Sequence, residues 1–180
     1  MLKPCESWKW YYDKSYKALM LDLGQNMAFR ANIPSFMLVD CAQRKSEFTV
    51  EDASSFYLFE EKIQMLDLPE ARKAELILNC VATRRFHKPM QPRSWFFDSH
   101  SKMYQPKDAE FVFFSNQLSK AFFIVVETNQ DTSICLSAEL QEFRLTESKS
   151  LSFCQAIKVM NDRLTKTDIN NSQPPYALVV

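Results

Sequence analysis

Four aromatic residues lie within five positions in the segment Ser7-Trp8-Lys9-Trp10-Tyr11-Tyr12-Asp13. Read at a period of two, Trp8, Trp10 and Tyr12 fall on one face of an extended chain, and the residues between them fall on the other. This alternation predicts a half-buried β-strand. An alternative interpretation is an exposed platform of aromatic rings and lysines that grips a ligand.

The pattern continues on both sides of a short turn. Residues 13–16 form a plausible turn, because an aspartate at its first position accepts a hydrogen bond from the following backbone. Residues 17–23 then alternate again, with Leu19, Leu21 and Leu23 on one face. A second turn at Gly24-Gln25 leads to a short strand over 27–30. The sequence therefore predicts a three-stranded antiparallel meander over residues 8–30.

Two helices are predicted after a loop around Pro34 and a brief apolar stretch over 36–39. Thr49 is a plausible N-cap, and acidic residues follow it where the helix dipole favours negative charge. The first helix has an apolar stripe made of Ala53, Phe56, Tyr57, Ile63 and Leu66. Pro69 opens the second helix, which runs to about His87. Its expected buried face is made of Ala74, Ile77, Leu78, Val81 and Ala82.

The segment 88–92 has two prolines in five residues and predicts a domain boundary, because proline cannot continue a helix and stiffens a connection. Beyond it, strands are expected over 94–98, 110–115, 121–127, 133–138 and 141–145. The runs FVFF and AFFIVV are continuous rather than alternating, which predicts strands covered on both faces in a closed or strongly curled sheet.

A final helix is predicted near the end of the chain. Ser152 and Gln155 have the spacing of a capping box, and apolar residues recur at helical spacing from Phe153 to Leu164. The predicted organisation is an N-terminal domain over 1–88, a C-terminal β domain with a closing helix over 89–165, and a flexible tail over 166–180.

Composition excludes several classes of function. The 22 basic and 22 acidic residues cancel, which argues against bulk attraction to nucleic acid or membrane surfaces. A single glycine, Gly24, leaves no phosphate-cradling loop. The five cysteines are widely spaced and form no C-x-x-C pair, which fits reduced thiols rather than a zinc site. We therefore expect no metal, no cofactor, no enzymatic activity and, without a signal-peptide core, a cytoplasmic location.

One local charge imbalance stands out against this neutral background. Arg84, Arg85, Lys88 and Arg93 fall within ten residues without an acidic residue among them. The helix dipole explains the first two, but the last two lie beyond the helix, among prolines and close to Trp95. A cation beside an aromatic residue on a stiff loop is typical of a protein-binding edge. Single-stranded nucleic acid is the competing ligand, because WKWYYDKSYK interleaves aromatic rings with lysines.

Several segments in the same order along the chain resemble ZapC, a family of bacterial cell-division proteins. They are WKWYYD (8–13), MLDL (20–23), FEEK (59–62), KAEL (73–76), KP (88–89) with SW (94–95), and AIKVMNDRL (156–164). The resemblance implies an α+β protein with an N-terminal α/β region, built from the meander and two helices, and a C-terminal twisted β-barrel-like domain.

The resemblance also implies a function. A ZapC-like protein would bind FtsZ at the mid-cell division ring, stabilise and bundle its protofilaments, and lower its GTPase turnover. The implied binding features are a hydrophobic pocket near Leu21 and the basic loop at Lys88 and Arg93, where lysine rather than arginine is expected at position 93. With Arg30 and Trp95 these residues make up the predicted FtsZ-binding set. The expected protein is a monomer or a weak dimer, and an adaptor for another acidic or apolar segment is the alternative.

Overall fold

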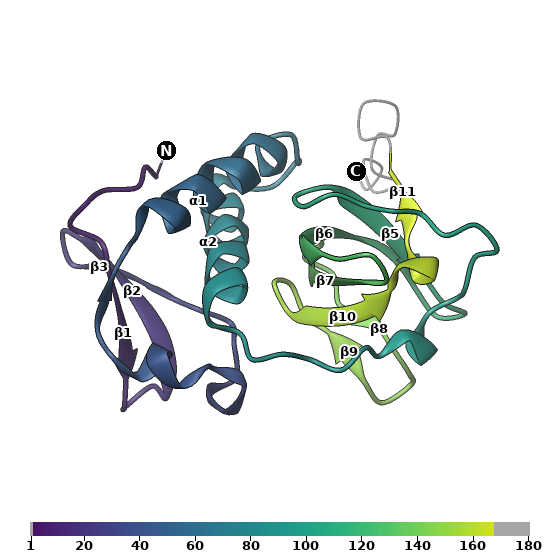
Figure 1. Ribbon diagram of the computed structural model, residues 1–180, viewed down its shortest axis with the longest axis horizontal. Coiled ribbons are helices and arrows are strands. Elements are labelled where there is room, and N and C mark those ends of the chain that lie inside the picture. Colours follow the sequence, from purple (N-terminus) through teal and green to yellow (C-terminus); the bar gives the residue numbers. More distant parts are fainter. Residues whose placement is uncertain (1, 168–180) are drawn as a thin grey trace, which may run out of the picture.

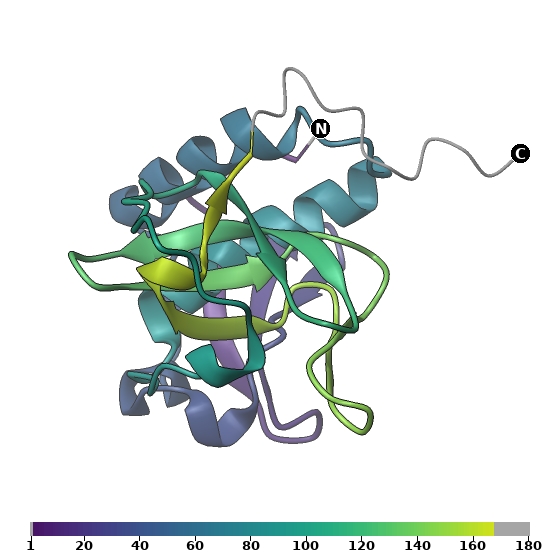
Figure 2. The same cartoon turned by 90° about the vertical axis from the view of Figure 1, so that its right-hand side faces the viewer.

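The computed structural model of this chain describes residues 2–167. The fold is α+β, as predicted: a four-stranded antiparallel sheet is followed by two helices and a five-stranded antiparallel sheet. A two-stranded ribbon lies between the third and fourth strands of the second sheet along the chain. Figure 1 shows the two helices between the N-terminal sheet and the C-terminal sheet. In the side view the C-terminal sheet lies in front of the helices (Figure 2).

The N-terminal sheet confirms the predicted meander. Its strands follow the order β3-β2-β1-β4. Trp10 lies opposite Leu21, and Leu21 lies opposite Phe29. These residues form an apolar row across three strands, and they belong to the same hydrophobic cluster as residues of the two helices. Gly24 has a φ of +77° in the turn between the second and third strands, where a side chain would be strained. The strands are β1 (Lys9–Asp13), β2 (Ala18–Gly24), β3 (Met27–Arg30) and β4 (Ser46–Glu47).

Helix α1 (Val50–Ile63) begins at the predicted cap. The Thr49 side chain accepts a hydrogen bond from the Asp52 backbone nitrogen, and the Asp52 carboxylate accepts one from the Thr49 nitrogen. The predicted apolar stripe is wrong at one position: Tyr57 is 52% exposed, whereas Phe59 is fully buried. The true stripe runs through Phe56, Phe59 and Ile63, because these positions share one face at helical spacing.

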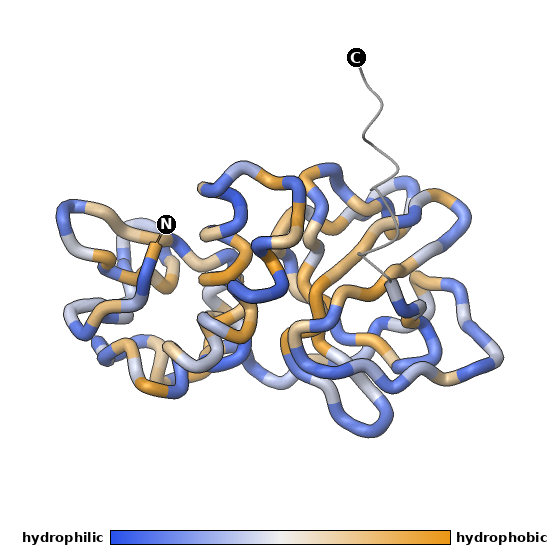
Figure 3. Tube along the Cα trace, turned by 90° about the horizontal axis from the view of Figure 1, so that it is seen from above, coloured by the Kyte–Doolittle hydropathy of each residue, from blue (hydrophilic) through white to orange (hydrophobic). Residues whose placement is uncertain are grey.

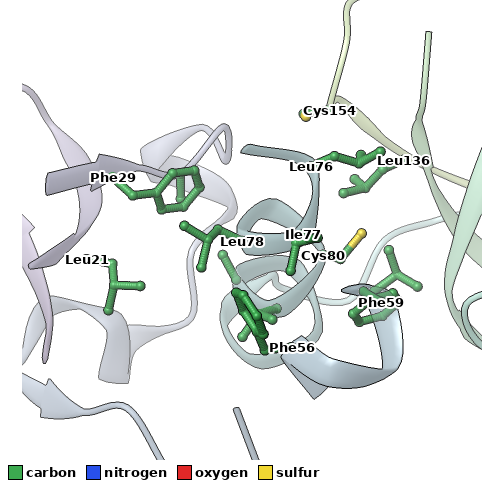
Figure 4. Packing of buried hydrophobic residues seen from close by; sticks show 14 of the residues in the cluster. Leu21, Phe29, Phe56, Phe59, Leu76, Ile77, Leu78, Cys80, Leu136 and Cys154 are labelled. Atoms are coloured by element: carbon green, nitrogen blue, oxygen red, sulfur yellow. The ribbon is translucent and has the colours of Figure 1, made fainter. Parts of the chain in front are cut away.

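Helix α2 (Glu70–Phe86) is buried on two sides rather than on the single predicted face. Every residue from Leu76 to Thr83 is buried. Figure 4 shows the reason: Leu78 lies on the side of Leu21 in the N-terminal sheet, whereas Cys80 lies on the side of Leu136 in the C-terminal sheet. One hydrophobic cluster therefore includes residues from both halves of the chain. Figure 3 shows hydrophobic segments gathered around the helices and the strands that face them.

The C-terminal sheet explains the continuous apolar runs. On β6, Ile124 and Val126 belong to the cluster shared with α2, whereas Phe123 and Val125 belong to a second cluster on the other face. Its strand order is β10-β7-β6-β5-β11, and the two end strands do not pair with each other, so the sheet is open rather than a closed barrel. The strands are β5 (Phe111–Ser115), β6 (Lys120–Thr128), β7 (Thr132–Ser137), β10 (Ala156–Met160) and β11 (Thr165–Lys166).

Two predicted strands of this half need correction. The segment 94–98 contains a 3₁₀ turn over Ser94–Phe96, because the Phe97 nitrogen donates to the Ser94 carbonyl within the segment instead of to a neighbouring strand. The Ser94 hydroxyl accepts a further hydrogen bond from the Met160 nitrogen. The segment 141–145 contributes only β8 (Phe143–Arg144), which pairs with β9 (Ser150–Leu151) in a separate ribbon.

The predicted final helix is wrong: residues 156–160 form strand β10. The Ser152 nitrogen does donate to the Gln155 side chain, but this hydrogen bond closes a turn instead of starting a helix. Cys154 lies in that turn with a φ of +64°, which is outside the helical region. Ile157 and Val159 are then buried with a period of two against β7. The predicted tail also begins too early, since Lys166 pairs with β5, and its remainder over 168–180 lies outside the described residues.

Candidate protein-binding site

The linker between α2 and the C-terminal sheet is held at both of its ends. His87 forms an isolated bridge with Leu38, and the Lys88 nitrogen donates to the Met37 carbonyl at 2.7 Å. At the other end the Arg93 nitrogen donates to the Lys158 carbonyl of β10 at 2.8 Å. In Figure 1 the linker runs from the end of α2 along the bottom of the molecule to the C-terminal half. Its cationic side chains therefore project from a fixed backbone.

The structure divides the predicted basic segment into paired and unpaired cations. Arg84 forms an ion pair with Asp108 at 2.7 Å, and Arg85 pairs with the buried carboxylate of Asp52. Within residues 2–167, Lys88 and Arg93 have no carboxylate oxygen within 4.0 Å, and both are exposed. These two residues remain available for an anionic partner.

Lys88 lines a cleft of about 240 Å³ between the end of α2 and the hairpin of β6 and β7. Two other charged residues of its wall, Lys158 and Glu127, have no ion pair within the described part of the chain. Burial lowers the pKa of His87, which also lines the cleft, and outweighs the opposing hydrogen bond to the Lys88 carbonyl. The ring is therefore neutral at neutral pH, and the lysines supply the positive charge.

Sequence reasoning missed Lys158 as a neighbour of the linker. It lies 70 positions after Lys88, and helical spacing of the apolar residues predicts a helix around it. Strand alternation of residues 156–160 is the signal that would have placed its side chain on one face with Ala156 and Met160.

Trp95 is an exposed aromatic residue at the C-terminal end of the linker. It lies in the 3₁₀ turn that follows Arg93, and its side chain is 71% exposed. Its ring lies beside that of Phe96, with centroids 5.4 Å apart. The predicted neighbours Lys88, Arg93 and Trp95 thus belong to one exposed connection.

Leu21 and Arg30 do not join this group. Leu21 has no exposed surface and packs inside the N-terminal sheet, so it contacts a partner only if that sheet opens. Arg30 is exposed on the edge strand β3, where its guanidinium lies 5.8 Å from the centre of the Tyr16 ring and donates to the Tyr16 carbonyl. The buried position gives Leu21 a part in the packing of the sheet.

The aromatic block at residues 8–12 is structural. Trp8 is 2% exposed and Trp10 is fully buried, with its indole nitrogen donating to Asp52 at 3.1 Å. Neither tryptophan ring is available to stack on a base, and both belong to the hydrophobic core.

Within residues 2–167 no cluster of three histidine, cysteine or carboxylate side chains has the arrangement to hold a metal ion. Across the same residues, no helix combines the length and apolar character that crossing a bilayer requires.

Comparison with known proteins assigns the family. The family model described as the N-terminal part of the cell-division protein ZapC matches residues 1–88, and the model of its C-terminal part matches residues 89–170. The chain belongs to the ZapC family. It is 49% identical over 179 residues to the cell division protein ZapC of Vibrio vulnificus and 45% identical to that of Vibrio cholerae, with 99% of each chain covered in both comparisons. The ZapC of Proteus mirabilis is 38% identical over 168 residues, covering 92% of this chain and 91% of that one.

Membership of the ZapC family gives the protein a role in cell division, and the family is not an enzyme class. The two family models meet at residue 88, where the linker begins. The lysine at this boundary, Lys88, also lines the cleft.

Proposed function

We propose that this ZapC-family protein binds FtsZ through the linker, with Lys88 and Arg93 pairing with acidic residues of FtsZ and Trp95 adding apolar contact. The observation that carries the proposal is the pair of exposed cations that have no carboxylate partner within residues 2–167 and lie on a backbone held at both ends. Charges arranged in this way speed the association of two proteins and fix their relative orientation. An aromatic side chain that becomes buried in the interface supplies most of the binding energy.

Binding of this kind would act on FtsZ by mass action. A protein that binds the polymer more tightly than free subunits shifts the equilibrium toward polymer. Slower subunit exchange then lowers GTP turnover, so the protein needs no active site of its own. Bundling requires two FtsZ contacts for each bridging unit, supplied by two surfaces of a monomer or by a weak dimer. The protein would act in the cytoplasm at the mid-cell ring.

The direct test is co-sedimentation of the purified protein with FtsZ in GTP and in GDP, together with the FtsZ GTPase rate. We expect pelleting that depends on GTP and a lowered rate. If the protein stays in the supernatant at tens of micromolar FtsZ, where weak interfaces are still populated, the proposal is wrong and an adaptor for another protein becomes the better interpretation.

Charge reversal tests the linker itself. Lys88→Glu combined with Arg93→Glu should weaken FtsZ binding by about tenfold or more, because attractive pairs become repulsive. The matched control is Lys14→Glu with Arg44→Glu, two exposed cations outside the linker that give the same change in net charge. Both variants should keep the circular-dichroism spectrum of the wild type. Equal loss in both variants would show that only net charge matters, and full binding by the linker variant would rule this surface out.

A further inference from the structure

The two most exposed aromatic side chains of the described residues flank the same linker. Phe36 is 73% exposed and Trp95 is 71% exposed, compared with 60% for Tyr16 and 52% for Tyr57. Single exposed apolar residues are ordinary on protein surfaces, so the exposure of either one alone carries little weight. Their common location is the informative feature.

Phe36 is fixed against Lys88 although the two residues are far apart in the sequence. It lies in a 3₁₀ turn over Ser35–Met37, and its carbonyl oxygen accepts a hydrogen bond from the Lys88 ammonium at 3.2 Å. The neighbouring Met37 carbonyl accepts a hydrogen bond from the Lys88 backbone nitrogen. The Phe36 ring therefore projects to solvent from a turn that is tied to the wall of the cleft.

The other end of the linker repeats this arrangement. Arg93, which has no carboxylate partner within residues 2–167, is followed two positions later by Trp95. A partner that fits both ends needs carboxylates to meet the cations and apolar side chains to cover the rings. An extended chain covers at most about 3.3–3.6 Å per residue. Lys88 and Trp95 are seven positions apart in the sequence, so a partner segment of roughly eight residues is long enough to reach from one to the other.

We propose that Phe36, Lys88, Arg93 and Trp95 form a docking strip for an extended acidic segment that carries a large apolar side chain near each end. The carboxylates of the segment pair with Lys88 and Arg93, and its apolar side chains cover Phe36 and Trp95. Phe36 is the apolar anchor at the cleft end of the strip. That this segment belongs to FtsZ rests on the proposed function, whereas the chemistry of the strip does not.

The test uses two fluorescein-labelled acidic peptides of about eight residues, one with a leucine near each end and one with glycine in both places, followed by fluorescence anisotropy. We expect the wild type to bind the leucine peptide about tenfold more tightly than the glycine peptide, because burying a leucine is favourable. Phe36→Ala should reduce that preference several-fold. The weak, salt-sensitive binding of the glycine peptide should stay the same.

Tyr57→Ala is the matched control, because it removes an exposed ring from helix α1 instead of from the linker. It should bind both peptides as the wild type does. Equal affinity of the wild type for the two peptides, or an unchanged preference in Phe36→Ala, would overturn the proposal.

Co-sedimentation separates this proposal from the proposed function. If the wild type pellets with FtsZ and the peptide preference is absent, the docking strip is wrong and FtsZ binding stands. If the leucine peptide binds in a Phe36-dependent manner and FtsZ does not pellet the protein, the strip stands and its partner is another acidic protein.

Discussion

At the scale of single residues, Asp52 connects three parts of the N-terminal half. It is 3% exposed, and its carboxylate accepts hydrogen bonds from the Trp10 indole, the Thr49 backbone nitrogen and the Arg85 guanidinium. A buried charge is tolerated only when its partners replace the water it has lost. This network fixes the register of α1 against α2 and the first strand.

Asp52→Asn tests the network while preserving side-chain volume. We expect a loss of about 2–3 kcal/mol in the free energy of unfolding, because Arg85 keeps its charge and loses its partner. Urea denaturation measures this as a lower midpoint at constant slope. The control is Glu61→Gln, which removes the surface ion pair with Lys62; the Glu61 side chain is 72% exposed. This substitution should change the free energy of unfolding by less than about 0.5 kcal/mol. Similar losses in the two variants would contradict the role of Asp52.

The cysteines give a second prediction at this scale. Burial raises the pKa values of Cys80, Cys135 and Cys154 well above their usual range, whereas hydrogen bonding to Ser7 lowers the pKa of exposed Cys5. Iodoacetamide should therefore modify only Cys5 and Cys41 of the native protein at neutral pH, because the thiolate is the nucleophile. Lowering the pKa populates the thiolate at lower pH, so modification of Cys5 should persist below the pH at which a free cysteine peptide stops reacting. Mass spectrometry of the native protein and of the protein in urea measures both effects.

At the scale of elements, local signals succeed where one segment makes its own contacts. The cap at Thr49 is predictable because its partner, Asp52, lies three residues away. The turn at Ser152 and Gln155 shows the limit of the same signal. Its predicted contact forms, but β7 offers a strand edge to residues 156–160, and pairing with that edge overrides helical spacing.

Thr49→Ala tests the cap of α1. We expect a loss of about 1 kcal/mol in unfolding free energy, because the Asp52 backbone nitrogen loses its acceptor. Ser54→Ala, an exposed substitution inside the same helix, should stay within about 0.5 kcal/mol of the wild type. Thermal unfolding followed by circular dichroism measures both, and a neutral Thr49→Ala variant would show that the cap adds nothing to the fold.

At the scale of the whole molecule, α2 joins the two halves into one hydrophobic cluster. Leu136 of the C-terminal sheet has no exposed surface and belongs to the same cluster as Trp10. The predicted boundary at 88 and 89 is then a boundary along the chain, and we expect the two halves to unfold together.

Leu136→Ala tests this coupling. We expect a loss of about 2–5 kcal/mol, because a buried leucine leaves a cavity. The loss should appear at the same denaturant midpoint in tryptophan fluorescence as in far-ultraviolet circular dichroism. The fluorescence change comes mainly from the buried Trp8 and Trp10 of the N-terminal half, because Trp95 is already 71% exposed in the native protein. Two separate midpoints, with the fluorescence transition left at its wild-type position, would show that the halves unfold independently.

The sequence by itself determined the features that depend on neighbours along the chain. The meander over 8–30, the start of α1 and the basic character of the linker follow from alternation, capping and composition. The tertiary structure alone decided which side chains meet across long separations. It buried Leu21, turned residues 156–160 into a strand beside the linker, and placed Phe36 against Lys88. Periodicity specifies which face of an element is apolar, but the partner that covers that face comes from elsewhere in the chain.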